Sequence, residues 1–368
     1  MTKTTEHTIT IIGFPYTSRP DTGRGIDRYL YELSNGIVQT TANFRILECG
    51  IVKPKFTELI LSSVKIFKEL LITKSAVYHA VDPFGAFFAI ILNKRPLITT
   101  IHDTIPLAPN SIQLIKELGK IRIPLSKGLL LISLKLSTKL VVPFEITKTE
   151  LVTIYGVNAE KIKKINYSIQ LTAGGNQRPY PSTDKSCKLL KILFIGGGNP
   201  VARGLKVVLS AYNELKNSGV NASLTLVGNT EIIHQELAIF RIATDDSIEV
   251  SKFIPEDELQ SFFERFDIFF YPSSLGFSFL VPQAMHAGTP VIVSDSRDMK
   301  EFIGDYDLVC APEDVDCFVQ FALKIYKDPN YRNVIIRESV NRASKFSSSK
   351  IIKEILELYE EVTSGKKN

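Results

Sequence analysis

Two hydrophobic periods alternate along the first half of the chain. Short runs of β-branched and apolar residues lie at 8–13, 44–47, 76–79, 97–101 and 139–142. Between them, apolar residues recur every three or four positions, as is typical of helices that bury one face. After the first run this spacing places the following residues on one stripe: Ile26, Tyr29, Leu30, Leu33 and Ile37. Strands that alternate with helices predict an open parallel sheet.

The same alternation starts again after residue 187. Residues 171–187 lack periodicity and are rich in Gly, Pro, Ser and Thr, as an interdomain linker would be. Strands are then predicted at 191–195, 224–227 and 268–271, and helices at 256–266 and 349–362. At 368 residues the chain is long for a single core. The pattern predicts two doubly wound α/β domains facing a cleft.

The segment 269–292 is the most informative part of the chain. It is predicted to form a buried strand, a loop with a glycine, a short helix and a second buried strand. A loop that enters a helix presents backbone N–H groups and the positive end of the helix dipole, which suits an anion such as a diphosphate. An ordinary βαβ crossover fits this spacing equally well.

The residues of this segment resemble the nucleotide-sugar site of the retaining glycosyltransferase family 4 (glycosyl transferases group 1, GT-B fold). Four short stretches match the family pattern: Pro272-Ser273, Gly276-Phe277, Ala284-Met285 and 288–292. The family has two glutamates eight residues apart, and these positions hold Leu275 and Gln283 here.

Other stretches follow the order of the same family. They are a glycine loop and helix at 23–33, a T-x-H-D-like segment at 98–106, a glycine loop at 195–204 and an element at 253–259. The resemblance implies two Rossmann-like domains, at 1–170 on the acceptor side and 188–345 on the nucleotide-sugar side. The linker is 171–187, and 346–368 is expected to return to the first domain.

The resemblance also implies roles for two charged or polar side chains. Arg203 is expected to hold the departing phosphate, because a guanidinium keeps its charge and forms forked contacts with phosphate oxygens. His102 is expected at the carboxyl end of a strand, near the donor sugar and the reacting centre. The remaining residues expected to bind the donor are Gly25, Gly196, Gly197, Gly198, Pro255, Leu275, Gly276, Phe277, Ser278 and Gln283.

The two replaced glutamates change what the donor site can offer. Gln283 keeps hydrogen-bonding capacity, so contact with the ribose hydroxyls is retained without the charge. Leu275 keeps none. Loss of one polar partner in a desolvated site costs about 1–3 kcal/mol. A less polar donor sugar and a weak enzyme are both consistent with this loss.

Acidic candidates lie on the acceptor side. Asp103 follows His102 directly, and Asp82 follows the predicted strand that ends at His79. Asp103 could either orient the residues around it or bind the acceptor. Asp82 and His79 could either belong to the core or contact the acceptor, and a place in the core is slightly favoured.

Charge is unevenly distributed along the chain. Residues 1–180 hold 23 Lys+Arg against 13 Asp+Glu, whereas the rest holds 21 against 26. The basic excess is dense at Lys116, Lys120, Arg122, Lys127 and Lys135, among Leu and Ile residues. A solvated helix face over a core face is slightly favoured here. The functional alternative is peripheral contact with an anionic membrane or a lipid-linked acceptor. Nucleic-acid binding is disfavoured because no recognised module accompanies the charge.

Cysteine usage and the first residues bear on location. Four cysteines are scattered along the chain and read as buried reduced thiols, and no signal-peptide pattern precedes the first strand. We therefore expect a cytoplasmic protein, with peripheral contact at the inner membrane face if the basic patch binds lipid. No D-x-D motif flanked by apolar strands occurs, and members of the family often need no metal, so no metal is expected. No cofactor is expected beside the nucleotide-diphosphate sugar that serves as donor substrate.

The favoured function is retaining transfer of a hexose or deoxyhexose from a nucleotide-diphosphate sugar to a glycan or lipid-linked acceptor. The alternative is a catalytically weak or inactive GT-B protein that acts as a binding partner or scaffold. A GT-B epimerase ranks last. A nicotinamide dehydrogenase is disfavoured because 196–200 lacks the G-x-G-x-x-G spacing. The choice of UDP, GDP or dTDP, the sugar, the acceptor and the oligomeric state are left open.

Overall fold

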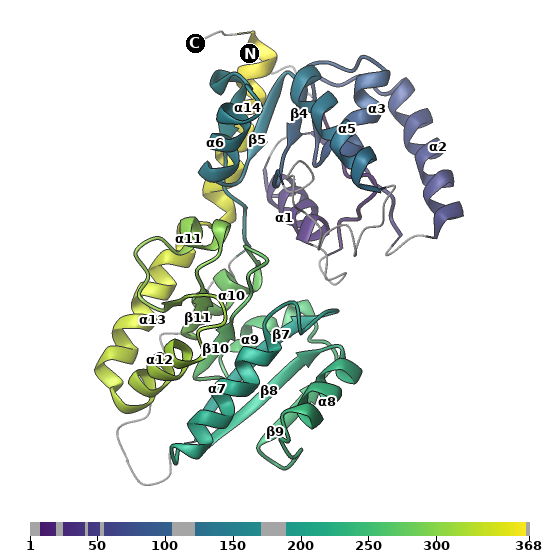
Figure 1. Ribbon diagram of the computed structural model, residues 1–368. Helices are drawn as coiled ribbons and strands as arrows, with labels where there is room; N and C mark the ends of the chain where they lie inside the picture. Colours follow the sequence, from purple (N-terminus) through teal and green to yellow (C-terminus); the bar gives the residue numbers. More distant parts are fainter. Residues whose placement is uncertain are drawn as a thin grey trace. The chain divides into compact units, whose positions relative to one another are not determined.

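The computed structural model describes residues 8–19, 25–40, 43–51, 55–104, 122–170 and 189–365. The chain divides into two compact units, the first made of 1–170 and 348–368 and the second of 171–347. Each unit contains one six-stranded sheet whose paired strands all run parallel, with helices against it (Figure 1). The predicted α/β class with two doubly wound sheets is confirmed. The predicted linker at 171–187 lies outside the described residues.

The sheet of the first unit has the strand order β2-β1-β3-β4-β5-β6. Its strands are β1 (Ile9–Ile12), β2 (Phe44–Leu47), β3 (Val77–Ala80), β4 (Leu97–Thr100), β5 (Lys139–Val142) and β6 (Ile162–Lys164). Its helices are α1 (Gly25–Val38), α2 (Phe56–Ile72), α3 (Pro83–Ile91), α5 (Arg122–Leu136), α6 (Glu145–Thr153) and α14 (Ser348–Ser364).

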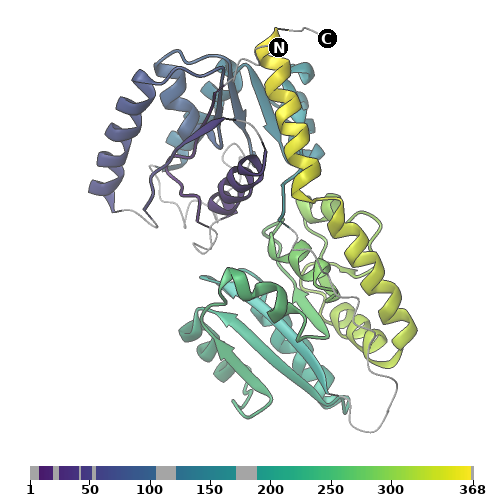
Figure 2. The same ribbon diagram turned by 180° about the vertical axis from the view of Figure 1, so that it is seen from behind.

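The pleat of this sheet separates two apolar layers. Tyr78 and Ala80 of β3 face one layer, where they pack with residues of α2 and α3, while His79 between them faces α14. The helices α2, α3 and α5 therefore cover one face, and α1 and α14 cover the other (Figures 1 and 2). The last helix of the chain thus belongs to the core of the first unit.

A buried polar chain ties α14 to this sheet. The Nδ1 atom of His79 lies 2.6 Å from the hydroxyl of Tyr359 on α14, and its Nε2 lies 2.8 Å from Oγ1 of Thr100 on β4. The hydroxyl of Tyr29 on α1 lies 3.1 Å from the same Thr100 oxygen. All four side chains are buried. Burial lowers the pKa of His79 to about 3, with the nearby His102 adding to the effect, so the ring is neutral at ordinary pH.

The sheet of the second unit has the order β12-β11-β10-β7-β8-β9. Its strands are β7 (Leu190–Gly197), β8 (Ala222–Gly228), β9 (Ile248–Ser251), β10 (Ile268–Tyr271), β11 (Val291–Ser294) and β12 (Val309–Cys310). Its helices are α7 (Leu205–Asn217), α8 (Thr230–Ile239), α9 (Leu259–Phe263), α10 (Leu280–His286), α11 (Arg297–Ile303), α12 (Val315–Lys327) and α13 (Pro329–Ser344). The helix predicted at 256–266 is shorter, a 3-10 turn at Glu256–Glu258 followed by α9.

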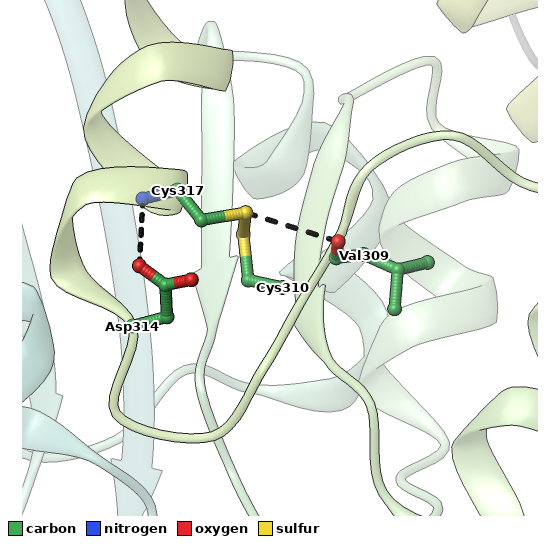
Figure 3. Close-up of a disulfide and its surroundings, with 4 residues drawn as sticks. All are labelled: Val309, Cys310, Asp314 and Cys317. Carbon is green, nitrogen blue, oxygen red and sulfur yellow. Dashed lines mark hydrogen bonds between the residues drawn. A yellow bond between two sulfur atoms is a disulfide. The ribbon is translucent and has the colours of Figure 1, made fainter.

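The expectation that all cysteines are reduced thiols is wrong for one pair. Cys310 at the end of β12 and Cys317 in the first turn of α12 form a disulfide, with Cα atoms 5.7 Å apart (Figure 3). Asp314, the N-cap of α12, accepts a hydrogen bond from the backbone N–H of Cys317 and so helps to place it. A strand-to-helix turn brings the two residues together, whereas sequence reasoning tested only C-x-x-C spacing. Cys49 is a free, buried cysteine.

In the part of the chain that the structure describes, no helix is long and apolar enough to cross a membrane.

The buried chain around His79 gives a stability prediction. Tyr359→Phe removes only a hydroxyl but leaves Nδ1 of a buried imidazole without its partner. We expect the free energy of unfolding to fall by about 1–3 kcal/mol, measured by urea unfolding with tyrosine fluorescence. Tyr155→Phe, at a half-buried tyrosine of the same unit, is the control and should change it by less. An equal loss in both variants would show that the hydroxyl of Tyr359 has no special role.

Candidate active site

The loops predicted to bind the donor lie side by side in the second unit. One follows β7 and the other follows β10, and these strands are neighbours in the sheet, with Ile268 paired to Ile192. Because parallel strands end at the same edge, both loops emerge together. They also touch. Gly204, at the end of the first loop, has φ +91°, and a Cβ there would come within 2.5 Å of the carbonyl oxygen of Pro272 in the second loop. Only glycine fits this position.

Arg203 is held at the junction of the two loops. Its Nη1 donates to the hydroxyl of Tyr271 at 2.9 Å and approaches Oγ of Ser273 at 3.5 Å. Tyr271 is buried, and its hydroxyl donates onward to the carbonyl of Gly276 at 3.3 Å. Ser273 in turn accepts from the backbone N–H of Leu275 at 3.2 Å. The guanidinium is therefore fixed by Tyr271 and Ser273, neither of which is among the residues expected to bind the donor, although Ser273 belongs to a stretch that matches the family pattern.

The fixed guanidinium still has donors to offer. It carries five N–H groups, and both contacts above use Nη1. Within the described part of the chain, Nε and Nη2 of Arg203 donate to no protein atom, and the side chain is half-buried. The backbone N–H groups of Arg203, Gly204 and Leu205 are already bonded to carbonyls of Pro200 and Val201. An anion here would therefore be held chiefly by the side chain and not by these amides.

The glycine loop itself is open. Gly196 packs tightly, since a Cβ there would come within 2.5 Å of Pro200. At Gly197 and Gly198 a Cβ would meet nothing within 4 Å, and both residues are exposed. This leaves the backbone of the loop accessible beside Arg203.

The two positions of the missing glutamates differ in their surroundings. Leu275 is 57% exposed, so it fills no core role. The side-chain amide of Gln283 donates to Oε1 of Glu256 at 2.9 Å. Glu256 follows Pro255 directly, at the start of the 3-10 turn after β9. A carboxylate thus lies beside Gln283 although neither glutamate of the family pattern is present.

The other predicted residues of this unit have local structural roles. The ring of Phe277 packs against those of Phe279 and Phe302 at centroid distances of 5.2 and 5.1 Å. Oγ of Ser278 accepts from the backbone N–H of Leu280 at 3.3 Å, at the entry to α10. Gly276 has φ +89°, and a Cβ there would come within 2.9 Å of the carboxylate of Asp298.

In the first unit, His102 is oriented by two hydrogen bonds. Its Nε2 lies 2.8 Å from the carbonyl oxygen of Val81, and its Nδ1 lies 2.9 Å from the hydroxyl of Tyr167. Because a carbonyl only accepts, Nε2 carries the proton and Nδ1 accepts from Tyr167. Burial lowers the pKa of His102 to about 4, while the bond to Val81 opposes this shift. The imidazole is therefore neutral near pH 7, with both nitrogens engaged by the protein.

Asp82 caps α3. Its Oδ1 accepts from the backbone N–H of Gly85 at 2.9 Å, and Pro83 occupies the first helical position. Burial raises the pKa of Asp82 to about 7, and hydrogen bonds from Gly85, Phe84 and Tyr16 oppose the shift.

The remaining predicted residues of this unit are Asp103, Gly25 and the five cations of the basic patch. Asp103 is half-buried beside His102. Gly25 begins α1, and a Cβ added there would meet nothing within 4 Å. Lys116, Lys120 and the side chain of Arg122 lie outside the described residues, whereas Lys127 and Lys135 are exposed on α5.

Comparison with known proteins relates the second unit to glycosyltransferases. Residues 190–328 match the family model described as "Glycosyl transferases group 1", to which this part of the chain is therefore similar. It contains β7, β10, both loops and Arg203. Known structures match nearly the whole chain, which therefore has the GT-B fold of glycosyltransferases.

Individual relatives are distant. The O-antigen chain mannosyltransferase B of Escherichia coli is 30% identical over 96 residues, which is 26% of this chain and a quarter of that protein. Sucrose-phosphate synthase from Thermosynechococcus elongatus matches with a TM-score of 0.75 at 14% sequence identity. The match covers 98% of this chain and 100% of the chain of the synthase. HepE of Anabaena, solved with UDP and glucose, has a TM-score of 0.69 at 12% identity, with 96% and 99% covered.

The neutral His102 predicts a pH dependence. Folded His102 has a pKa near 4, whereas a histidine in an unfolded chain titrates near 6.5, so between these values only the unfolded chain gains the proton. The free energy of unfolding contributed by this group therefore rises with pH from 4 to 6.5, by up to about 1.4 kcal/mol per pH unit. His79 acts in the same direction and Asp82 in the opposite one, and both remain in a His102→Gln variant.

We expect the stability of His102→Gln to rise less steeply over this range than that of the wild type, as measured by urea unfolding at each pH. His234→Gln, at an exposed position of α8, is the control and should follow the wild-type profile. Parallel profiles for wild type and His102→Gln would contradict a neutral imidazole whose pKa is lowered in the folded chain.

Proposed function

We propose that this chain transfers a hexose or deoxyhexose from a nucleotide-diphosphate sugar to a glycan or lipid-linked acceptor, with retention of anomeric configuration. The observation that carries the proposal is Arg203. It lies where two loops meet in the part of the chain that matches the group 1 family model. Its Nη1 is bound by Tyr271 and Ser273, which leaves Nε and Nη2 able to donate to an anion. Retention follows from the resemblance to family 4.

The chemistry asks for fixed positive charge at the leaving group. As the bond between the anomeric carbon and the diphosphate breaks, negative charge grows on the phosphate oxygens. A guanidinium already oriented by Tyr271 and Ser273 needs little rearrangement to stabilise that charge. The exposed backbone at Gly197 and Gly198 allows close approach of the donor beside it.

Gln283 and Glu256 are proposed to recognise donor hydroxyls together. The amide nitrogen of Gln283 is turned to Glu256, so the amide oxygen and the carboxylate offer acceptors, which suit sugar hydroxyl donors. Glu256 would thus supply negative charge that the missing glutamates cannot. Leu275 presents an apolar surface to whatever part of the donor it meets.

In the first unit, a role of His102 at the reacting centre and acceptor contacts of Asp103 and Asp82 stay proposals. Neutral His102 could act on the donor sugar only by exchanging its bond to Tyr167 or to Val81 for one to substrate. An acceptor of the glycan class is supported by the relative named as an O-antigen chain mannosyltransferase. Membrane contact through Lys116, Lys120, Arg122, Lys127 and Lys135, and a place in the cytoplasm, also remain proposals.

A catalytically weak or inactive binding protein is the second candidate. It is favoured by Leu275, an exposed apolar side chain at the position where the family has a glutamate. The two candidates differ in turnover and not in donor binding, so an assay of sugar transfer to glycan acceptors separates them. Transfer above the hydrolysis background supports the enzyme, and donor binding without transfer or hydrolysis supports the second candidate.

The phosphate role of Arg203 is tested by calorimetry with UDP- and GDP-sugars, mannose and glucose donors included. We expect the wild type to bind at least one donor and Arg203→Ala to bind it about ten- to a hundredfold more weakly, because a charge-assisted hydrogen bond is worth about 1.5–3 kcal/mol. Lys206→Ala, at an exposed cation in the first turn of α7, is the matched control and should bind normally. Equal affinity of Arg203→Ala and wild type would refute the role.

Metal independence is a separate prediction. No group of three or more His, Cys, Asp or Glu side chains suited to a metal occurs among the described residues, and fixed cationic charge is available from Arg203. Transfer activity should be unchanged in excess EDTA. Activity that disappears with EDTA and returns with added Mg²⁺ or Mn²⁺ would show that a metal ion takes part.

A further inference from the structure

Exposed apolar side chains are concentrated on one helical layer of the first unit. Among the described residues, 18 large hydrophobic side chains are exposed, and ten of them belong to three helices. They are Ile60, Leu61, Val64, Leu71 and Ile72 of α2, Ile91 of α3, and Leu125, Leu131, Ile132 and Leu136 of α5. These helices cover the same face of the sheet (Figure 1). The five exposed in the second unit are scattered over several elements.

Helix α2 is apolar on two opposite sides. Ile66 and Leu70 point into the core of the first unit. The five exposed residues of α2 are 47 to 77% accessible and, at about 100° per residue, lie within an arc of roughly 120° on the other side. Soluble helices normally place polar residues there, so the outer side of α2 is suited to contact with something apolar.

The charges on this layer are predominantly positive. Lys65 and Lys68 lie on the outer side of α2, Lys74 follows the helix, and Lys127 and Lys135 are exposed on α5. Of the described acidic residues of α2, Glu58 caps the start of the helix, and Glu69 lies toward its flank, where its carboxylate is 3.9 Å from Nζ of Lys65. Lys68 falls near the middle of the apolar arc. A lysine in that place can lie along an apolar surface and extend its ammonium to anionic groups at the boundary.

We propose that the outer side of α2, defined by Ile60, Leu61, Val64, Leu71 and Ile72 with Lys65 and Lys68, inserts into the headgroup region of an anionic lipid membrane. Apolar residues interleaved with cations match the boundary between acyl chains and phosphates. A second copy of the chain fits less well. A two-fold contact through α2 would bring Lys65 and Lys68 toward the same lysines of the copy.

This surface extends the predicted basic patch to a helix that the sequence analysis did not single out. In the sequence, the core residues and the exposed apolar residues of α2 look alike. They separate onto two opposite sides of the helix only once the structure shows which side packs on the core. Exposed residues of α5 in the same layer add to the contact. The proposal does not depend on glycosyl transfer, because lipid binding is measured without donor or acceptor.

The test is cosedimentation of the full chain with vesicles of equal parts phosphatidylglycerol and phosphatidylcholine, and with vesicles of phosphatidylcholine alone. We expect binding to the anionic vesicles that weakens at high salt. The variant Leu61→Gln/Val64→Gln/Ile72→Gln should bind about tenfold less or worse, because it removes exposed apolar surface while keeping helix propensity. Lys65→Gln/Lys68→Gln should lose mainly the salt-dependent part.

Two matched controls keep the test specific. Val38→Gln/Ile154→Gln/Ile239→Gln changes side chains 63 to 67% exposed outside α2, α3 and α5, and Lys350→Gln/Lys353→Gln changes exposed cations of α14 on the opposite face of the sheet. Both should bind vesicles as the wild type does. The proposal is overturned if the wild type fails to bind anionic vesicles, if the α2 variants bind unchanged, or if the controls lose as much. It is also overturned if light scattering finds a dimer that the α2 triple variant converts to monomer.

Discussion

The hydrogen bond between Arg203 and Tyr271 joins the two loops on which the candidate site is built. It exists because β7 and β10 are neighbouring parallel strands, so that the loops at their carboxyl ends emerge at one edge. Tyr271 is the last residue of β10 and is buried, which fixes its hydroxyl. The bond to Gly276 extends this order into the second loop. A long, mobile side chain is thereby converted into a fixed charge.

The polar groups of the first unit show the opposite arrangement. His79, His102 and Asp82 direct their polar atoms to protein partners, and burial favours the neutral form of each side chain. Such groups define which helix packs where: His79 fixes α14 and Asp82 starts α3. The second unit instead fixes the guanidinium of Arg203, whose Nε and Nη2 donate to no atom of the described residues. Of the two units, the second is therefore the one where we propose an anionic ligand.

Local patterns in the sequence are enough for strands such as β7, β8 and β10 and for the two loops of the second unit, because periodicity and glycine act over a few residues. They do not predict the short strands β6, β9 and β12. They could not reveal contacts between distant segments. Glu256 and Gln283 are 27 residues apart and meet only through the sheet order. The Cys310–Cys317 disulfide depends on the turn between β12 and α12. Tyr271 was predicted as a buried strand residue, yet nothing in the strand pattern showed that its hydroxyl would bind Arg203.

The charge distribution constrains how a donor could be held. Residues 181–368 carry 21 Lys+Arg against 26 Asp+Glu, so the half of the chain with the candidate site is net negative. Long-range attraction from this half would not favour a diphosphate, and at physiological salt it is screened beyond about 8 Å. Binding must then depend on charge in direct contact with the phosphate. Because no second cation follows the first glycine of the β7 loop, where Gly197 and Gly198 stand, that requirement falls on Arg203.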